Sequence, residues 1–366
     1  MTSDGRMFQR DALGVPMENP LARDLDHVLS HTEELWAPTR GERFFLTGGT
    51  GFVGTWLTES LLWANRRLSL GISAVLLTRN PEAFRKRSPH LAGDPAVTLW
   101  TGDGATFAYP DGRFSLVVHA ATERYFPPDA AQPAATFDLD VTATRRVLEL
   151  ARTRGAARLL FNSSGAVYGK QPPALAHIPE DYPGAPPPTD TSSAYGQGKR
   201  ISEYLCACYS QVHGLEATIA RLFAFIGPLL PLDAGYAAGN FLRDALGGGP
   251  IHIAGDGSPF RSYLYTADLA IWLWTILFRG QGARPYNTGS AEEISIAELA
   301  RAIAREAAPE AEIRVAQTAA PGAPAARYVP DIDRAEHELG LRTWISLDEA
   351  IRRTHAWHLL ARAGRQ

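Results

Sequence analysis

The sequence predicts an α/β fold in which a doubly wound parallel sheet is followed by a smaller carboxyl-terminal α/β lobe. The first observation is that short apolar segments alternate with helical segments between residues 43 and 223, the order that right-handed βαβ units produce. The second is that this regularity ends after Pro228, where short strands and helices are mixed. A length of 366 residues suits one large domain or two closely joined lobes.

Six strands are predicted in the first part of the chain, each a short apolar run bounded by loop residues. They are RFFLT (43–47), SAVLLT (73–78), VTLWT (97–101), LVVHA (116–120), RLLF (158–161) and ATIARLF (217–223). Helices are predicted between them over Phe52–Asn65, Asp138–Arg154 and Tyr195–His213. Such an order places helices on both faces of a parallel sheet.

The segments on either side of this region are less regular. An amino-terminal extension, residues 1–40, contains a predicted helix over Leu21–Trp36, with a partly disordered leader as the alternative. The sheet-forming domain is assigned residues 41–228, and the smaller lobe, residues 229–366, can return one or two elements to the main sheet. Within this lobe we predict strands near 251–255 and 262–266, helices near 267–278, 296–306 and 347–358, and a surface loop at 315–326.

Composition and charge disfavour several classes of partner. A formal net charge of −3 gives no electrostatic reason to expect nucleic acid or an anionic membrane. No apolar run approaches the ~20 residues that span a bilayer, and the amino terminus lacks a signal-peptide core, so a cytoplasmic location is expected. Cys206 and Cys208 would point to different faces of a helix, which disfavours a disulfide and fits a reducing compartment. No metal site is predicted.

A glycine-rich segment, TGGTGFVG (47–54), follows the first predicted strand and opens a helix. In this context Gly48 allows a tight turn, Gly51 lets the backbone approach a pyrophosphate, and Gly54 lets the helix pack on the strand. The helix amino terminus then offers unpaired N–H groups to the phosphates. The sequence therefore predicts a Rossmann-type NAD(P)-binding domain. The cofactor-binding residues predicted in this segment are Gly48, Gly51, Phe52, Val53 and Gly54.

The residues after the second and third strands bear on which cofactor is bound. NAD-binding folds usually place an acidic residue at the end of the second strand, but this chain has Thr78-Arg79-Asn80 there. Because Arg79 can pair with a 2′-phosphate, NADP(H) is favoured over NAD(H), with an exposed arginine of no special role as the alternative. Asp103, after the third strand, is predicted either to accept a bond from the adenine amino group or to form a turn.

The predicted catalytic residues lie in SAYGQGK (193–199), where Tyr195 and Lys199 share one face of a helix. A phenol has a reference pKa of about 10, and a nearby ammonium together with a nicotinamide ring stabilises the phenolate. Tyr195 can then remove a proton from a sugar-type hydroxyl while hydride leaves its carbon. Ser164 follows the fifth strand, at the sheet edge where ligands bind, and can hydrogen-bond the same oxygen; a turn-forming hydroxyl is the alternative.

Together these motifs resemble those of the extended short-chain dehydrogenases/reductases, the nucleotide-sugar epimerase/dehydratase family. The matching segments run in family order over about residues 43–357. They are TGGTGFVG (47–54), VVHAAT (117–122), NSSGAVYG (162–169), SAYGQGK (193–199), IARLFAFIGP (219–228), GDGSPFRSYLYTADLA (255–270), YNTGS (286–290) and LGLRTWISLDEAI (339–351). Residues 1–40 lie outside the resemblance.

The resemblance implies roles for particular residues. Ser164, Tyr195 and Lys199 would form the catalytic triad, and Ala120 and Ala121 would lie beside the nicotinamide ribose. The carboxyl-terminal lobe would bind a nucleoside-diphosphate sugar. The substrate-binding residues implied or considered are Glu123, Ser164, Asn240, which would contact the sugar nucleotide, and Arg261, which would grip its diphosphate. Family members are usually homodimers joined through helices that include the Tyr–Lys helix.

Three positions depart from the family pattern. Nucleotide-sugar 4,6-dehydratases carry an Asp-Glu pair directly after the triad hydroxyl residue, where this chain has Gly165 and Ala166. Standard dehydration is therefore disfavoured unless Glu123 or Tyr168 supplies the acid and base. Ala224 replaces an amide residue, and Asp140 replaces an asparagine that normally braces the site.

The leading hypothesis is therefore hydride transfer at a sugar carbon of a nucleotide sugar, expected at C4, with epimerisation as the outcome. One alternative is an NADPH-dependent keto-sugar reductase, which Arg79 favours. Another is a dehydratase with non-standard acid and base residues. A non-catalytic dinucleotide-binding sensor or scaffold is the alternative from another class. It is disfavoured because Tyr195 and Lys199 are both present.

Overall fold

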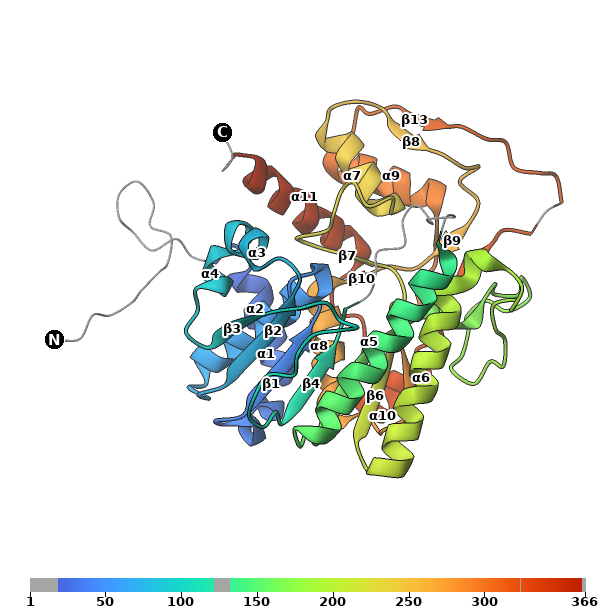
Figure 1. The fold of residues 1–366 in the computed structure, drawn as a ribbon. Helices are drawn as coiled ribbons and strands as arrows, with labels where there is room; N and C mark the ends of the chain where they lie inside the picture. Colours follow the sequence, from blue (N-terminus) through green and yellow to red (C-terminus); the bar gives the residue numbers. More distant parts are fainter. Residues whose placement is uncertain (1–18, 122–131, 323, 364–366) are drawn as a thin grey trace, which may run out of the picture.

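A computed structural model describes residues 19–121, 132–322 and 324–363 of the chain. Its centre is a parallel sheet with strand order β11-β6-β5-β4-β1-β2-β3 (Figure 1). The strands are β1 (Arg43–Thr47), β2 (Ser73–Thr78), β3 (Val97–Thr101), β4 (Leu116–His119), β5 (Arg158–Ser164), β6 (Glu216–Leu222) and β11 (Pro285–Thr288). The predicted doubly wound parallel sheet is confirmed, and β11, from beyond residue 229, is its seventh strand.

Two layers of helices bury the two faces of this sheet. Alternate residues of β1 point to opposite sides, so Phe44 and Leu46 join one apolar cluster and Phe45 joins the other. The first cluster is completed mainly by α1 (Ala22–Thr32), α2 (Phe52–Arg67) and α8 (Thr266–Arg279). The second is completed by α5 (Pro133–Thr153) and α6 (Ala194–His213), and α3 (Pro81–Arg87) and α4 (Pro89–Ala92) connect β2 to β3.

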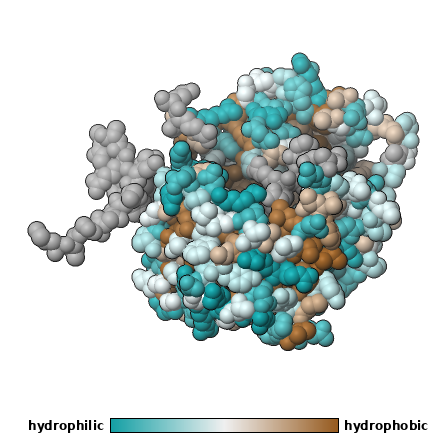
Figure 2. All heavy atoms as spheres, in the orientation of Figure 1, coloured by the Kyte–Doolittle hydropathy of each residue, from teal (hydrophilic) through white to brown (hydrophobic). Residues whose placement is uncertain are grey.

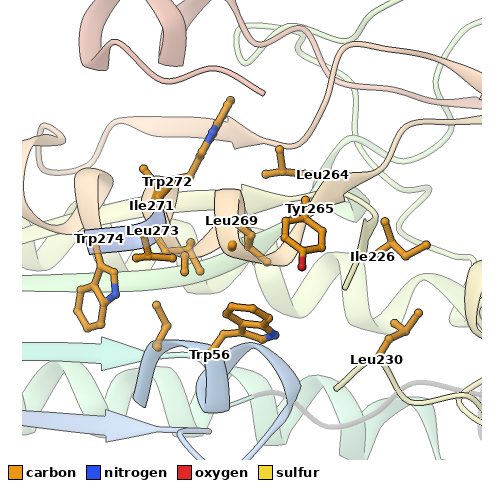
Figure 3. Packing of buried hydrophobic residues seen from close by; sticks show 14 of the residues in the cluster. Trp56, Ile226, Leu230, Leu264, Tyr265, Leu269, Ile271, Trp272, Leu273 and Trp274 are labelled. Carbon is orange, nitrogen blue, oxygen red and sulfur yellow. The ribbon is translucent and has the colours of Figure 1, made fainter. Parts of the chain in front are cut away.

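The most deeply buried helix is α8, whose residues from Thr266 to Leu277 are all buried. Figure 3 shows Trp272 and Trp274 of this helix among the packed side chains, with Trp56 of α2 close by. The indole nitrogens of two tryptophans are satisfied there, because Trp274 donates to Ser60 Oγ at 2.8 Å and Trp56 donates to the Pro228 carbonyl at 2.9 Å. An element from beyond residue 229 is thus part of the main core.

The smaller lobe combines short strands with three further helices (Figure 1). These helices are α7 (Ala237–Leu246), α9 (Ile296–Ala307) and α11 (Leu347–Ala363), while α10 (Asp333–Leu339) packs beside β11. Short strands pair as β8 (Ile251–Ile253) with β13 (Ile313–Val315), β7 (Phe225–Ile226) with β10 (Leu264–Tyr265), and β9 (Phe260–Arg261) with both β12 (Ile294–Ser295) and β14 (Arg327–Tyr328). The helices predicted near 267–278, 296–306 and 347–358 are confirmed, whereas α7 and α10 were not predicted.

The helix predicted in the amino-terminal extension is present as α1, and its Leu25 and Val28 are fully buried. Asp24 anchors this helix to the smaller lobe. Its carboxylate accepts a hydrogen bond from Tyr265 Oη at 2.7 Å and from Arg353 of α11 at 2.5 Å. The pKa of the Tyr265 phenol is raised because the group is buried and lies beside this carboxylate.

The sheet changes winding direction between β1 and β4, which are hydrogen-bonded neighbours. In open α/β sheets, ligands bind in the crevice at the carboxyl ends of the strands at such a point. The predicted site residues that follow β1, β4 and β5 therefore lie along one edge of the sheet. Among the residues that the structure describes, no helix has both the length and the apolar character needed to cross a membrane.

Candidate active site

The glycine loop after β1 passes directly against the segment after β4. Gly48 has a φ of +68°, and a Cβ added to it would lie 2.5 Å from both the Ala120 carbonyl carbon and the Ala121 nitrogen. The same segment is tied to β1, because the Ala120 N–H donates to the Thr47 carbonyl at 3.1 Å. Only glycine allows this backbone contact, which brings the predicted phosphate loop next to the two alanines.

The start of α2 keeps the space in front of its first amides open. Gly51 precedes this helix, and a Cβ there would meet only the Gly48 carbonyl oxygen, at 3.3 Å. A Cβ at Gly54, in contrast, would lie 2.0 Å from that oxygen. The first turn of α2 therefore packs so closely on the glycine loop that no side chain fits between them. Phe52 packs on Phe225, with ring centroids 5.5 Å apart, and Val53 is half-buried. This cradle fits a dinucleotide pyrophosphate at a helix amino terminus.

Arg79 and Asp103 follow the carboxyl ends of the adjacent strands β2 and β3, where Gly102 N–H donates to the Thr78 carbonyl at 3.1 Å. The Arg79 side chain is exposed. Asp103 forms a turn, since its carboxylate accepts from the Ala105 N–H at 2.9 Å. A second cation lies nearby, because Arg87 of α3 donates to the Thr50 carbonyl in the glycine loop.

Ser164, Tyr195 and Lys199 meet where β5 ends and α6 begins. A short 3-10 turn, η3 (Gly165–Tyr168), follows Ser164, and Ser164 Oγ accepts from the Ala166 N–H at 3.1 Å. A Cβ at Gly196, the residue after Tyr195, would lie 2.7 Å from the Ala166 carbonyl oxygen, so the first turn of α6 is pressed against η3. Lys199 Nζ lies 5.6 Å from the Tyr195 ring centroid and donates to the Asn162 carbonyl at 3.2 Å.

Burial and Asp140 shift the pKa of Lys199 in opposite directions. Burial of the ammonium lowers the Lys199 pKa, and the Asp140 carboxylate of α5 is the largest influence that opposes this effect. Asp140 lies close to α6, because a Cβ at Gly198 would lie 3.2 Å from Asp140 Cβ. The replacement of the family's asparagine by Asp140 therefore puts a carboxylate beside the Lys199 ammonium.

The imidazole of His119 lies behind this group and is kept neutral. Burial and the nearby Lys199 lower the His119 pKa to about 3. Its ring nitrogens contact Thr47 Oγ1 at 2.6 Å and Thr144 Oγ1 at 3.1 Å. Burial also raises the pKa of the Cys206 thiol, and neither cysteine is in a disulfide. Neither group offers an ionised nucleophile to the site at neutral pH.

Tyr328 of β14 lies beside Ser164 at the candidate site, and no sequence motif singled it out. Its hydroxyl lies 3.5 Å from Ser164 Oγ and 3.4 Å from the Leu222 carbonyl oxygen. Its ring packs on Phe223, with centroids 4.6 Å apart. Burial and the nearby Tyr195 raise the Tyr328 pKa, so this phenol remains a hydrogen-bond donor. The adjacent strand β9 places the Arg261 guanidinium 5.7 Å from the Tyr328 ring centroid.

In the part of the chain that the structure describes, the other predicted substrate-binding residues are not shown in contact with Ser164 or Tyr328. Asn240 is a half-buried residue of α7, where its side-chain oxygen accepts from Arg243 at 3.3 Å. Tyr236, which precedes the same helix, contributes to the raised Tyr328 pKa and so connects α7 to the site. Glu123 lies outside the described residues. Ala224 is half-buried, and its carbonyl accepts from the Leu264 N–H at 3.1 Å.

The space after Ser164 is closed to an added side chain. A Cβ at Gly165 would lie 2.7 Å from both Phe223 Cζ and Tyr328 Oη. Tyr168 does not replace the missing acid or base, since its hydroxyl donates to Asn287 Oδ1 at 2.7 Å and accepts from Arg221 at 2.8 Å. Burial also raises the pKa of Tyr168. The suggestion that Tyr168 serves a dehydration is therefore disfavoured by the structure.

Relatives among characterised proteins match most of the chain. UDP-glucuronic acid decarboxylase 6 of Arabidopsis thaliana is 30% identical over 324 residues, which cover 86% of this chain and 90% of the relative. UDP-glucuronic acid decarboxylase 1 of Xenopus tropicalis is 30% identical over 314 residues, covering 86% of this chain and 71% of the relative.

Solved structures show the same fold. UDP-glucose 4-epimerase of Thermotoga maritima with UDP-glucose has a TM-score of 0.74 and 19% identity, covering 87% of this chain and 99% of its own. DesIV, a dTDP-glucose 4,6-dehydratase of Streptomyces venezuelae with NAD and TYD bound, has a TM-score of 0.73 and 24% identity, covering 88% and 98%. The sequence model of the NAD dependent epimerase/dehydratase family matches residues 44–289. The chain therefore belongs to this family of extended short-chain dehydrogenases/reductases.

Proposed function

We propose that this protein oxidises a nucleotide sugar at a ring carbon, at C4, using a nicotinamide dinucleotide and Tyr195 as the acid–base group. The observation that carries the proposal is the meeting of two parts of the chain at Ser164. The Tyr195–Lys199 helix approaches Ser164 from one side, and Tyr328, with Arg261 beside it, approaches from the smaller lobe. The family and the names of the relatives support a nucleotide sugar as substrate.

In the proposed reaction, a nicotinamide dinucleotide held by the glycine loop and by Ala120 and Ala121 would supply the hydride acceptor for the sugar carbon. Tyr195 takes the proton of the hydroxyl on that carbon, so that a C=O bond forms as the C–H and O–H bonds break. Lys199 stabilises the phenolate of Tyr195 through its charge. The Ser164 hydroxyl donates to the same sugar oxygen, and its own oxygen accepts from the Ala166 N–H. Return of hydride and proton to the ketone completes a redox-neutral cycle.

Epimerisation is one outcome of this cycle. Hydride returned to the opposite face of the 4-keto sugar inverts the carbon, and this outcome needs no acid–base pair beyond the triad. The closed space after Ser164, where Gly165 leaves no room for a carboxylate, is consistent with this simple chemistry. Epimerisation stays a prediction, because the lack of a carboxylate side chain at Gly165 is also compatible with other redox-neutral reactions.

Decarboxylation is a second candidate, favoured by the relatives at 30% identity. Oxidation at C4 of a uronic acid places a ketone β to the carboxylate, so the C5–C6 bond can break and release CO2. The enolate left behind takes a proton from water at C5, and the ketone at C4 can then be reduced again. This route also starts with the proton transfer to Tyr195 and needs no carboxylate at positions 165 and 166. The substrate, rather than a different triad, then decides between the two outcomes.

One experiment tests the proposal and separates its outcomes. The purified protein is incubated with NAD+ or NADP+ and a panel of UDP-, GDP-, CDP- and dTDP-sugars that includes UDP-glucuronic acid, and products are followed by mass spectrometry and NMR. An unchanged mass with an inverted carbon identifies an epimerase, and loss of CO2 identifies a decarboxylase. In a separate incubation with NADPH and a nucleotide-linked keto sugar, net consumption of NADPH identifies the reductase alternative. Full turnover by Tyr195→Phe would refute the proposed mechanism.

We also propose that NADP(H) is preferred over NAD(H). Support comes from Arg79 at the end of β2, where NAD-specific folds usually have a carboxylate, and from the second cation, Arg87, at the glycine loop. The neighbour DesIV has NAD bound, so the preference has to be measured on this protein. Fluorescence titration with NADPH and NADH gives the ratio of the two dissociation constants. A ratio in favour of NADH contradicts the proposal.

A homodimer built on α6 is proposed from the exposed apolar side chains of that helix. Ile201, Tyr204 and Val212 are 40%, 66% and 71% exposed, and Figure 2 shows hydrophobic surface over this helix among hydrophilic residues. Light scattering is expected to give the mass of two chains for the wild type and of one chain for Tyr204→Glu. A cytoplasmic location is proposed as well, and the two free cysteines support a reducing compartment.

A further inference from the structure

A buried ion pair lies directly behind the catalytic residues and has no part in the reaction described above. Glu203 is one turn beyond Lys199 on α6, and Arg221 is on β6. Arg221 donates to Glu203 through Nε at 3.0 Å and through Nη2 at 2.7 Å, and the two side chains are 12% and 11% exposed. Burying such a pair carries a desolvation penalty that its attraction barely offsets, so its presence calls for a reason other than stability.

Glu203 reaches the strand that carries the catalytic serine. Its carboxylate accepts a hydrogen bond from Ser163 Oγ, and Ser163 is buried at the end of β5, next to Ser164. One carboxylate thus connects the last residues of β5 with the helix that carries Tyr195 and Lys199.

Arg221 extends the connection toward the smaller lobe. Its Nη1 donates to Tyr168 Oη at 2.8 Å, and Tyr168 in turn donates to Asn287 Oδ1 of β11 at 2.7 Å. The Asn287 amide then donates to the carbonyls of Ile178, at 2.8 Å, and Asp331, at 2.9 Å. Asp331 follows Tyr328 by three residues, so the relay of buried polar groups ends on the segment that places the second phenol beside Ser164.

We propose that Glu203 and Arg221 are positioning residues for the reaction. They hold the Ser164 hydroxyl, the Tyr195–Lys199 pair and the Tyr328 segment in one rigid arrangement. Both act through other side chains, since their polar atoms are occupied by protein groups on β5, α6 and the loop after η3. The inference rests on the proposed function, because the quantity it concerns is the rate of hydride transfer.

The negative charge of Glu203 has an additional effect on Lys199. Three negative or ionisable groups raise the Lys199 pKa against the effect of burial, namely Asp140 from α5 and Cys206 and Glu203 from α6. His119 faces the same ammonium from β4 and remains neutral. Removal of the Glu203 charge therefore lowers the Lys199 pKa further. The alkaline limb of the kcat/KM profile, where the ammonium loses its proton, is then expected at lower pH.

The decisive experiment compares Glu203→Gln with a matched control, Asp24→Asn. The Asp24–Arg353 pair is equally buried, with side chains 9% and 15% exposed, but it joins α1 to α11 away from the site. We expect Glu203→Gln to lower kcat about 10- to 100-fold, the cost of a small misplacement of reacting groups, while the Kd for NADP+ stays within about twofold. Asp24→Asn is expected to lower the thermal midpoint to a similar extent and to keep the wild-type kcat.

Ser163→Ala is a second variant that keeps the ion pair and its charge. It removes one neutral hydrogen bond, so it is expected to fold normally and to lower kcat about fivefold without moving the alkaline limb. This variant decides the question if Glu203→Gln does not fold. A wild-type kcat in Ser163→Ala would then overturn the inference.

Two further results would also overturn it. One is a Glu203→Gln enzyme with wild-type kcat and an unmoved alkaline limb. The other is a loss of kcat in Asp24→Asn equal to that in Glu203→Gln, because the effect would then follow stability alone. If the wild type binds NADP+ or NAD+ but turns over no nucleotide sugar, the proposed function fails, and the inference fails with it. If the wild type turns over a nucleotide sugar and Glu203→Gln has the same kcat, only the inference is refuted and the proposed function stands.

Discussion

Gly165 offers a sharp test of the shape of the site. An ideal Cβ at this position lies 2.7 Å from Phe223 Cζ and from Tyr328 Oη, whereas carbon atoms in contact usually stay about 3.5–4.0 Å apart. The two rings are packed on each other, with centroids 4.6 Å apart, so one cannot retreat without moving the other. Extra atoms in a packed interior typically cost about 1–3 kcal/mol. Gly165→Ala is therefore expected to lose this amount of unfolding free energy.

Chemical denaturation of four variants (Gly165→Ala, Tyr328→Phe, the double variant and Gly249→Ala) measures the effect and locates its source. Tyr328→Phe removes one of the two closest atoms and leaves the Phe223 contact, so Gly165→Ala in that background is expected to cost about 0.5–1 kcal/mol less than alone. Gly249→Ala is the control. Nothing lies within 4 Å of a Cβ there and φ is not in the left-handed region, so its stability should be unchanged or slightly higher.

Activity gives an independent measure of the same displacement. Since Gly165→Ala pushes Tyr328 away from Ser164, kcat/KM for the nucleotide sugar is expected to fall together with stability. A Gly165→Ala protein as stable as the wild type would show that Phe223 and Tyr328 do not close this space. Strict additivity in the double variant, within about 0.3 kcal/mol, would exclude Tyr328 from the contact.

Three other predictions concern single side chains. Tyr328→Phe removes one hydrogen-bond donor and should lower kcat/KM about tenfold, with the Kd for NADPH unchanged as the check. Arg79→Ala should weaken NADPH binding about tenfold and leave NADH binding unaffected, measured by fluorescence titration; equal losses would contradict a 2′-phosphate contact. His119 has a pKa lowered from 6.5 to about 3, so the unfolded chain binds its proton more readily between these values. The folded protein should therefore lose up to about 5 kcal/mol as pH falls through this range. Urea unfolding at several pH values gives the unfolding free energy as a function of pH. This free energy should fall less steeply with decreasing pH in His119→Asn than in the wild type, and an unchanged pH dependence would refute the lowered His119 pKa.

The main sheet was predictable because its strands are short apolar runs with clear boundaries. β2 and β3 coincide with the predicted segments SAVLLT and VTLWT, and α2 begins at Phe52 as predicted. β11 was not predicted as a strand, because Pro285–Thr288 is a short polar segment that becomes a strand only by pairing with β6. α5 begins at Pro133 rather than Asp138, since its first turn has no apolar periodicity.

The residues of the candidate site that belong to sequence motifs were predictable. Those that reach the site only through pairing of distant short strands were not. Ser164, Tyr195 and Lys199 stand in recognisable segments, and the structure brings them to one edge of the sheet. Tyr328 could not be found in this way, because β14 has two residues and gains its place from β9 and from the bridge between Ile178 and Pro330. No local sequence pattern predicts a contact between Ser164 and Tyr328, which lie far apart in the sequence.

The path of β11 also constrains how the protein can be made. During synthesis β6 leaves the ribosome well before β11, so one side of β6 has no partner strand until much of the smaller lobe has emerged. An unpaired apolar strand edge is a template for wrong pairing between chains. A gene fragment ending near residue 228 would keep that edge bare and lose α8 as well, so it is expected to aggregate. Folding of the main sheet is therefore completed only when the segment that contains β11 has been made.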